Sequence, residues 1–397
     1  MKSHPSIPRG VWVLGFVSLL MDLSSELIHS LLPVFMVSAL GASVLMVGIV
    51  EGIAEATALI VKVFSGTLSD YLGKRKALVV FGYGLGAVSK PIFALALTVP
   101  WVLAARFMDR IGKGIRGAPR DALVADITPP EVRGAAYGLR QSLDTVGAFL
   151  GPLLAIALMI VWAGDFRAVF WFAVIPAVLC VALLIAGVRE PLAPARDGKA
   201  RLPIHWRTLR ALGRDYWWVV VIGGIFALAR FSEAFLILRA RDHGLPDTYA
   251  PLVLVVMNVV YALTAYPAGR LADRMSHQAL LIAGLAVLIV ADVALAHAQG
   301  LGVVAAGVVL WGLHMGLTQG LLATMVADTA PAALRGAAFG FFNLISGIAM
   351  LIASVLAGFL WDELGAATTF YAGAVISTVA LVLLVARNGK SARSPIP

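Results

Sequence analysis

The sequence predicts an all-α integral membrane protein with twelve transmembrane helices in two pseudo-symmetric six-helix bundles. The first observation is composition: the chain is 60% hydrophobic and only 13% charged, and its mean hydropathy is +0.91. A soluble domain carries about 25% charged residues, so a water-soluble core would not hide this much apolar surface. The other two observations are a series of apolar runs and a sequence repeat that relates the two halves of the chain.

The apolar runs form two sets of six on either side of one long polar segment. A bilayer core about 30 Å thick needs roughly 20 helical residues, and each run is near or above that length. The polar segment, residues 188–214, is predicted to be a cytoplasmic linker between an N-terminal bundle at residues 1–187 and a C-terminal bundle at residues 215–397. The twelve expected helices are residues 11–37, 43–69, 76–98, 100–120, 135–163, 167–187, 215–239, 248–270, 277–297, 300–326, 336–360 and 366–387.

The basic residues of the loops predict the orientation. Cytoplasmic loops carry an excess of Lys and Arg. Placing both termini in the cytoplasm puts most of these residues on that side and leaves Arg167, Arg239 and Arg241 outside. The net charge of +9 is therefore explained by topology in a cytoplasmic (inner) membrane, and nucleic-acid binding is not expected. The single cysteine, Cys180, excludes an intramolecular disulfide framework.

A repeat links the two halves. The segment Val124–Gly138 recurs as Val326–Gly340, with Asp-x-x-Pro-x-x-x-Arg-Gly in both copies. Two six-helix halves in the same orientation imply a two-fold axis along the membrane normal, with a binding site at the bilayer midplane between the halves.

A charged, glycine-punctuated stretch separates the second and third runs. Residues Gly66–Lys76 read Gly-Thr-Leu-Ser-Asp-Tyr-Leu-Gly-Lys-Arg-Lys, and we predict that they form a tight cytoplasmic loop. The pattern resembles the loop between helices 2 and 3 of the major facilitator superfamily of secondary transporters. That resemblance implies a cytoplasmic gate motif that comprises Gly66, Leu68, Asp70, Gly73, Arg75 and Lys76. It also implies that the Asp70 carboxylate lies near the N-terminus of the helix that begins around Gly336.

The two repeated segments look like the second cytoplasmic signature of the same family. Their acidic and basic members, Asp126 with Arg133 and Asp328 with Arg335, would form a latch that pairs when the inner side is closed. The alternative is that the two arginines only anchor helix ends to lipid headgroups. In the fifth run, Gly147, Gly151 and Pro152 resemble the start of a motif found in drug-proton antiporters. Small-residue packing with a proline kink explains these residues equally well.

Carboxylates inside the spans are the expected proton-coupling residues. Each ionisable group at a helix centre costs about 2.5 to 3.5 kcal/mol, so it must face protein or water. Asp22 and Glu26 share one face of the first helix with His29, and Glu51 and Glu55 share one face of the second. The alternative is a permanently paired structural set, for example Glu55 with Lys62.

The fourth run is unusually basic. Arg106, Asp109 and Arg110 lie in its apolar part, and the seventh run adds Arg230 and Glu233 at similar depth. These residues would either pair with the carboxylates of the first two helices or bind an anionic group of the substrate. Arg110-x-x-Lys113-Gly114 is the nearest match to an arginine motif of the family, with lysine in place of glutamine.

Together these features predict a proton-coupled secondary active transporter of a small solute that works by alternating access, with efflux slightly favoured over uptake. The expected partners are the solute, protons and the lipid bilayer, and a monomer is expected. The alternative is a transport-inactive membrane sensor or assembly factor that keeps the fold. No nucleotide loop or catalytic triad indicates an enzyme, no cofactor is implied, and His314 with Met315 and Met325 makes a poor metal site.

Overall fold

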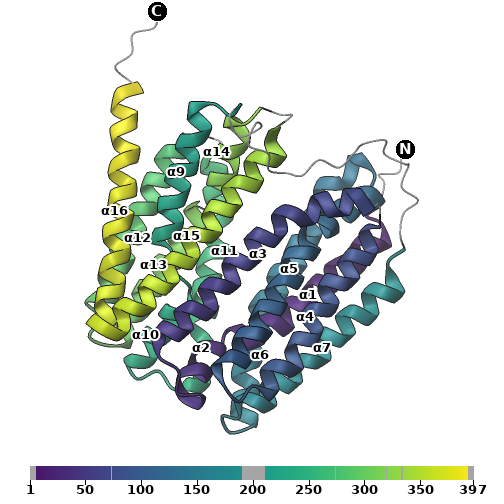
Figure 1. Cartoon of the computed structure of the whole chain (residues 1–397), viewed down its shortest axis with the longest axis horizontal. Helices are drawn as coiled ribbons and strands as arrows, with labels where there is room; N and C mark the ends of the chain where they lie inside the picture. The colour runs from purple at the N-terminus through teal and green to yellow at the C-terminus, as the bar shows by residue number, and fades with distance from the viewer. Residues whose placement is uncertain are drawn as a thin grey trace, which may run out of the picture. The chain divides into compact units, whose positions relative to one another are not determined.

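The computed structural model describes residues 6–72, 74–189, 211–272, 274–318, 320–331 and 334–391, without the side chains of residues 67, 70 and 387–391. The all-α prediction is confirmed: these residues form helices and no strand (Figure 1). Eleven helical segments within the described residues are long and apolar enough to cross a membrane. The helix α5 (Val99–Ile127) is as long as the others and completes the predicted twelve, but it carries charges along its length.

The chain divides into two compact units. Unit 1 comprises Met1–Leu40 and Thr57–Pro203, and unit 2 comprises Gly41–Ala56 and Ile204–Pro397. The helix α3 (Val44–Leu72) contributes its first half to unit 2 and its second half to unit 1. Residues 190–210 of the predicted linker lie outside the described residues.

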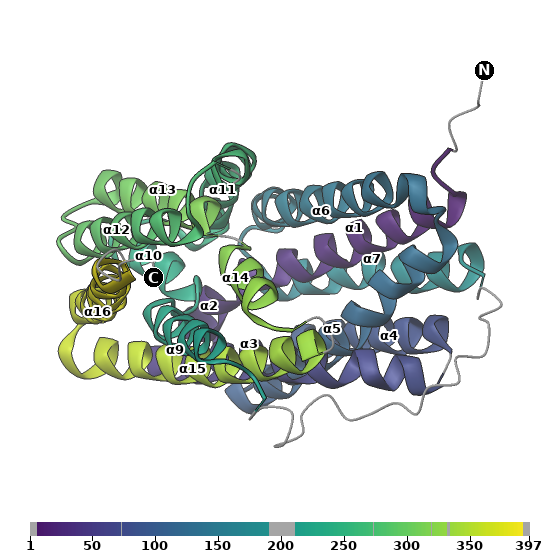
Figure 2. The same cartoon turned by 90° about the horizontal axis from the view of Figure 1, so that it is seen from above.

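In unit 1, α1 packs against α6 and α7, and α4 packs against α5 and α7 (Figures 1 and 2). Helices α4 and α5 approach closely at two glycines. A Cβ at Gly82 would lie only 2.7 Å from the Gly112 carbonyl oxygen, so this approach requires glycine. Gly147 and Gly151 of α6 likewise face the backbone of α1. The remaining helices of unit 1 are α1 (Arg9–His29), α2 (Leu32–Val34), a π-helix (Phe35–Ala39), α4 (Arg75–Leu95), a 3₁₀ turn (Pro130–Val132), α6 (Arg133–Val161) and α7 (Phe166–Gly187).

In unit 2, α13 packs against both α11 and α12, and α9 packs against α15 and α16 (Figure 2). The first half of α3 packs on α15, since a Cβ at Gly358 would lie 2.7 Å from the Leu45 Cα. The helices are α9 (Arg214–Ala229), α10 (Ala234–Asp242), a 3₁₀ turn (Asp247–Tyr249), α11 (Leu252–Ala272), α12 (His277–Ala296), α13 (Leu301–Thr318), α14 (Leu321–Thr329), α15 (Arg335–Leu364) and α16 (Ala366–Ser391).

The prediction of a loop at Gly66–Lys76 is wrong for most of its length. Helix α3 continues to Leu72 and α4 begins at Arg75, so only two residues separate the helices. Glycine disfavours a helix interior by about 1 kcal/mol relative to alanine, but packing overrides this preference. A Cβ at Gly66 would lie 3.5 Å from the Ala118 Cβ, which shows that this end of α3 packs against α5.

Two predicted spans are broken in unit 2. The span predicted at 215–239 ends as α9 at Ala229 and resumes as α10 at Ala234. The span predicted at 300–326 is divided between α13 and α14, and Gly320 in this break has φ +81°. Hydropathy averaged over a whole span does not reveal such breaks, even though the first contains Arg230, Ser232 and Glu233, because the long apolar stretches on both sides dominate the average. Breaks inside membrane helices free backbone groups and commonly lie at binding sites.

Candidate functional site

The interior of unit 1 contains a buried ion pair between α4 and α5. The Lys90 Nζ donates to Asp109 Oδ1 at 2.8 Å and to the Ser25 hydroxyl of α1 at 2.9 Å. Both charged side chains are less than 5% exposed. Arg110 lies beside them, with its Nε 3.9 Å from Asp109 Oδ2, and Arg106 is also buried on α5. Arg106 and Arg110, which were predicted from the fourth apolar run, therefore lie near Asp109 on α5. The closest cation, Lys90, comes from α4.

A second, partly buried group joins α1, α5 and α6. The carboxyls of Asp22 and Asp144 are hydrogen-bonded to each other. Arg120 and Arg140 each place an Nη1 3.7 Å from Asp144 Oδ1. A hydrogen bond between two carboxyl groups requires a proton, since ionised carboxylates only accept. This pair can therefore store one proton between α1 and α6.

The same group is tied to α4 through Tyr83. The Arg120 Nη1 donates to the Ser18 hydroxyl at 3.1 Å and to the Tyr83 hydroxyl at 3.4 Å. The Arg116 guanidinium lies over the Tyr83 ring, 4.6 Å from its centroid, in a cation–π contact. Glu26, which the sequence grouped with Asp22, instead accepts a hydrogen bond from His29 Nδ1 at 3.2 Å. The predicted stripe on the first helix thus divides between two sets of partners.

In unit 2, the predicted acidic and basic residues meet at the break between α9 and α10. Arg230 is the first residue after α9, and the charges of Glu233 and Glu55 act on it. Its guanidinium lies 5.8 Å from the ring centroid of Phe226. Glu51, one turn before Glu55 on α3, is buried. This arrangement joins one cation and several carboxylates and can hold a solute group of either charge, depending on protonation.

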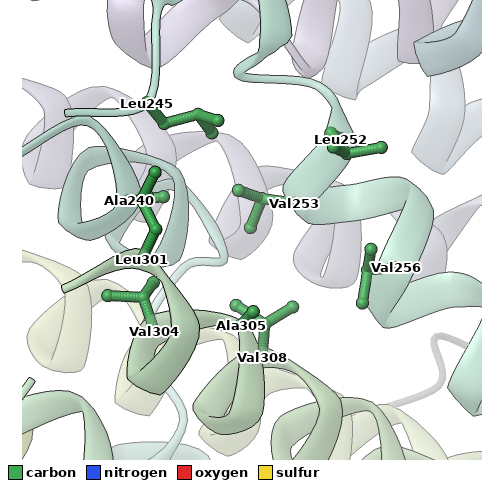
Figure 3. Close-up of a pocket in the computed structure, with 9 residues that line it drawn as sticks. All are labelled: Ala240, Leu245, Leu252, Val253, Val256, Leu301, Val304, Ala305 and Val308. Atoms are coloured by element: carbon green, nitrogen blue, oxygen red, sulfur yellow. The ribbon is translucent and has the colours of Figure 1, made fainter. Parts of the chain in front are cut away.

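The same unit contains an aliphatic pocket (Figure 3). Its volume is about 200 Å³, and side chains from α10, α11, α13 and the loop after α10 point into it. The lining offers no hydrogen-bonding side chain, so it would select an occupant by shape and apolarity alone. The lining residues are Ala240, Leu245, Leu252, Val253, Val256, Leu301, Val304, Ala305 and Val308.

The gate residues form local contacts at the helix ends. Arg75 pairs with Asp126 at 2.6 Å, and at the equivalent place in unit 2 His277 lies 3.7 Å from Asp328. Arg133 donates to the Thr128 carbonyl at 3.3 Å, and Arg335 donates to the Ala327 carbonyl at 3.2 Å. The two arginines of the repeat therefore bind carbonyls of their own segments. The Asp70 side chain and Gly73 lie outside the described residues, so their gate role stays a prediction.

Comparison with known proteins explains the repeated architecture. Residues 14–246 and 231–397 match the Major Facilitator Superfamily model. An uncharacterised MFS-type transporter of Methanocaldococcus jannaschii is 30% identical over 393 residues, which cover 97% of this chain and 96% of the relative. The chain belongs to the major facilitator superfamily. It is accordingly a multi-pass membrane protein of a transporter family.

Other superfamily members are similar over nearly the whole chain. The multidrug resistance protein MdtH of Yersinia pestis is 26% identical over 360 residues, which cover 89% of this chain and 87% of that protein. The nucleoside transporter NupG, solved as a D323A mutant, superposes with a TM-score of 0.80 at 12% identity, covering 95% of this chain and 99% of NupG. The human organic anion transporter MFSD10 gives 0.68 at 18% identity, covering 96% of this chain and all of that one. These two structures confirm the MFS fold.

Sequence reasoning missed three of the ionisable residues in the interior of this MFS protein. They share one signal, a lone charge inside an apolar run, and Asp144 also lies one helical turn from Arg140. A lone charge is a weaker signal than the acidic stripes of the first two predicted helices or the basic residues of the fourth. The missed residues are Lys90, Asp144 and Asp292.

Proposed function

We propose that this protein is a proton-coupled secondary active transporter of a small solute in the cytoplasmic membrane, with both termini in the cytoplasm and with efflux favoured over uptake. The observation that carries the proposal is the hydrogen-bonded pair of Asp22 and Asp144. It provides a proton-binding site inside a membrane protein of a transporter family, at a contact between two helices. A protein that only senses or scaffolds has no need to keep such costly groups.

The pair couples protonation to packing between α1 and α6. When its shared proton leaves, two like charges face each other, and only Asp144 has Arg120 and Arg140 as close partners. The repulsion favours separation of the carboxyls and hydration of Asp22. Alternating access needs such a bias between two states, and an external proton gradient would supply its direction. Glu26, Glu51 and Glu55 remain further candidates for the same role.

The solute is proposed to bind in unit 2, at the helix break around Arg230. Glu233 and Glu55 give this region an acidic character, and the aliphatic pocket offers space for an apolar group. Efflux of amphipathic solutes is consistent with the relative named as a multidrug resistance protein. The chemistry is binding and release, and no enzymatic step is proposed.

The test uses purified protein in liposomes with an imposed proton gradient and ethidium as the first solute probe. We expect ethidium movement that depends on the gradient, together with solute-dependent dissipation of that gradient. In Asp22→Asn, gradient-driven ethidium transport should fall to the level of protein-free liposomes, because the shared proton is lost. Ethidium binding should persist, since the proposed solute site lies elsewhere.

Glu131→Gln is the matched control, because it makes the same chemical change at an exposed carboxyl. If Asp22→Asn and Asp144→Asn both transport like the parent, the proposed proton site is wrong. If the parent moves neither protons nor ethidium, nor neutral and anionic dyes tested in the same way, the transport-inactive alternative gains support.

A further inference from the structure

Asp292 on α12 differs from the other buried acids. Its side chain is 0% exposed, and neither carboxyl oxygen has a hydrogen-bond partner among the described residues. It belongs to neither the Asp22–Asp144 pair nor the group around Arg230. An ionisable residue of this kind inside a membrane helix is costly and calls for a functional explanation.

Its surroundings are aromatic and tight. A Cβ at Gly373 of α16 would lie 2.6 Å from Asp292 Oδ2 and 3.1 Å from the Phe231 ring. Glycine at position 373 therefore makes room for the carboxyl, and Phe231 borders the same space. The Phe231 ring packs against Phe235, Trp311 and Phe370 with centroids 5.3 to 5.6 Å apart.

Among the described residues, no charged side chain forms a hydrogen bond or ion pair with Asp292. Arg230 is the neighbour of Phe231 in sequence, but the charges that act on its guanidinium are those of Glu233 and Glu55. The titratable groups on helices packed against α12 have other contacts within the described residues. They are His314 with the Gly284 carbonyl, Tyr371 with His297, and Asp328 with His277. The buried Arg239 of α10 also reaches α12, where its guanidinium donates to the Leu295 and Ala296 carbonyls rather than to Asp292.

An unpaired carboxylate in such surroundings would carry a very large desolvation cost, whereas a neutral carboxylic acid costs far less. A metal cation would need several oxygen ligands, and the described residues contain no group of three or more His, Cys, Asp or Glu side chains that could hold one. The occupant that fits is a proton. We propose that Asp292 is a second proton-binding site, separate from Asp22 and Asp144, and that Phe231 seals it from water.

Phe231 also gives this site a means of opening. It lies in the break between α9 and α10, one residue after the partly exposed Arg230. Movement at the break would carry the ring away from Asp292 and admit water, which lets the proton leave. The carboxyl then becomes charged and hydrated, and the site cannot close again until a proton returns.

Infrared spectroscopy tests the proposal without measuring transport. The reference protein is Asp22→Asn, which removes the other proposed shared proton, and its spectrum is compared with that of Asp22→Asn/Asp292→Asn. We expect a protonated-carboxyl C=O band at neutral pH in the first protein and its loss in the second. Glu363→Gln, an exposed carboxyl on α15, should leave the band intact. Asp292→Leu replaces the amide variant if that protein does not accumulate.

The seal is tested with Phe231→Ala in the same background. Its band should shift on transfer to D₂O at least tenfold faster than that of the sealed protein, and it should disappear at a lower pH. Absence of a protonated-carboxyl difference at both neutral and mildly acidic pH would overturn the proton site. An unchanged exchange rate in Phe231→Ala would overturn the sealing role. Neither result depends on whether the Asp22–Asp144 pair drives transport.

Discussion

In unit 1 the interior charges pair with one another across four helices, whereas in unit 2 the carboxyl of Asp292 has no partner among the described residues and borders the ring of Phe231. Lys90 meets Asp109, and Arg120 and Arg140 meet Asp144. The two units nevertheless resemble each other at their helix ends. The first residue of α4, Arg75, pairs with Asp126, and the first residue of α12, His277, pairs with Asp328. The repeat has thus kept the helix ends while the interiors have diverged.

The difference has a physical consequence. A network of paired charges is sensitive to the loss of any one member, because the remaining partner is left buried and uncompensated. An isolated neutral acid can be replaced by an amide of the same shape with little loss, since no partner is stranded. Substitutions in unit 1 should therefore affect folding, and those at Asp292 should affect protonation.

The largest expected effect is at Lys90. Lys90→Met strands Asp109 in the interior, and breaking a buried pair in this way costs about 3 to 5 kcal/mol. We expect a comparable fall in the free energy of unfolding in mixed micelles, together with a lower yield. Replacing both partners in Lys90→Met/Asp109→Leu should recover most of the loss. The control is Arg241→Met, whose pair with Asp247 is about one-third exposed and should contribute only about 0 to 1 kcal/mol.

Two results would break the comparison. A Lys90→Met protein as stable as the parent would show that Arg110 or Arg106 already compensates Asp109. A double variant no more stable than the single one would show that the lysine stem, rather than its charge, holds α4 and α5 together.

Much of the fold could be predicted from the sequence. The apolar runs located nearly all helix ends to within a few residues, because the bilayer imposes a length that hydropathy detects. The breaks at Arg230–Glu233 and at Gly320 could not be predicted in this way, since they depend on tertiary contacts rather than polarity. The prediction of a loop at Gly66–Lys76 was wrong for a related reason, because packing against α5 extends α3 to Leu72.

The candidate site was predicted less completely. The sequence indicates Asp22, Arg110 and Arg230 because an ionisable side chain inside a membrane span carries a desolvation cost whatever its partners. Their partners depend on how helices pack, so Lys90 and Asp144 were not connected to them. The isolation of Asp292 is likewise a property of its neighbours and leaves no pattern in the chain.

The next effect concerns helix capping, which also differs between the units. Asp165 caps its own helix, accepting from the Arg167 and Ala168 amides, whereas Asp362 of α15 accepts from the Val44 and Leu45 amides of α3 at 3.1 and 2.9 Å. Loss of a cap costs about 0.5 to 2 kcal/mol. Hydrogen exchange should show faster amides at the start of α7 in Asp165→Ala and at the start of α3 in Asp362→Ala.

Asp362→Ala should also loosen the first half of α3 from α15, whereas Asp165→Ala should disturb only α7. The protection of backbone amides from hydrogen exchange between Gly48 and Gly52 distinguishes these outcomes, because both glycines pack directly on α15. If Asp362→Ala leaves that protection unchanged, glycine packing alone holds α3 in unit 2.

The smallest effect lies at the helix ends that the repeat has preserved. Arg75 and Asp126 are 2.6 Å apart and their side chains are 15% and 32% exposed, whereas His277 and Asp328 are 3.7 Å apart and 32% and 61% exposed. Pairs this accessible contribute about 0 to 1 kcal/mol and are screened by salt. Asp126→Asn should therefore destabilise the protein more than Asp328→Asn, and the difference should shrink at high salt. His277→Arg would place an arginine at the start of α12, as Arg75 stands at the start of α4. It should stabilise the protein slightly, and only while Asp328 is present. An equal gain in His277→Arg/Asp328→Asn would show that the two ends are not equivalent.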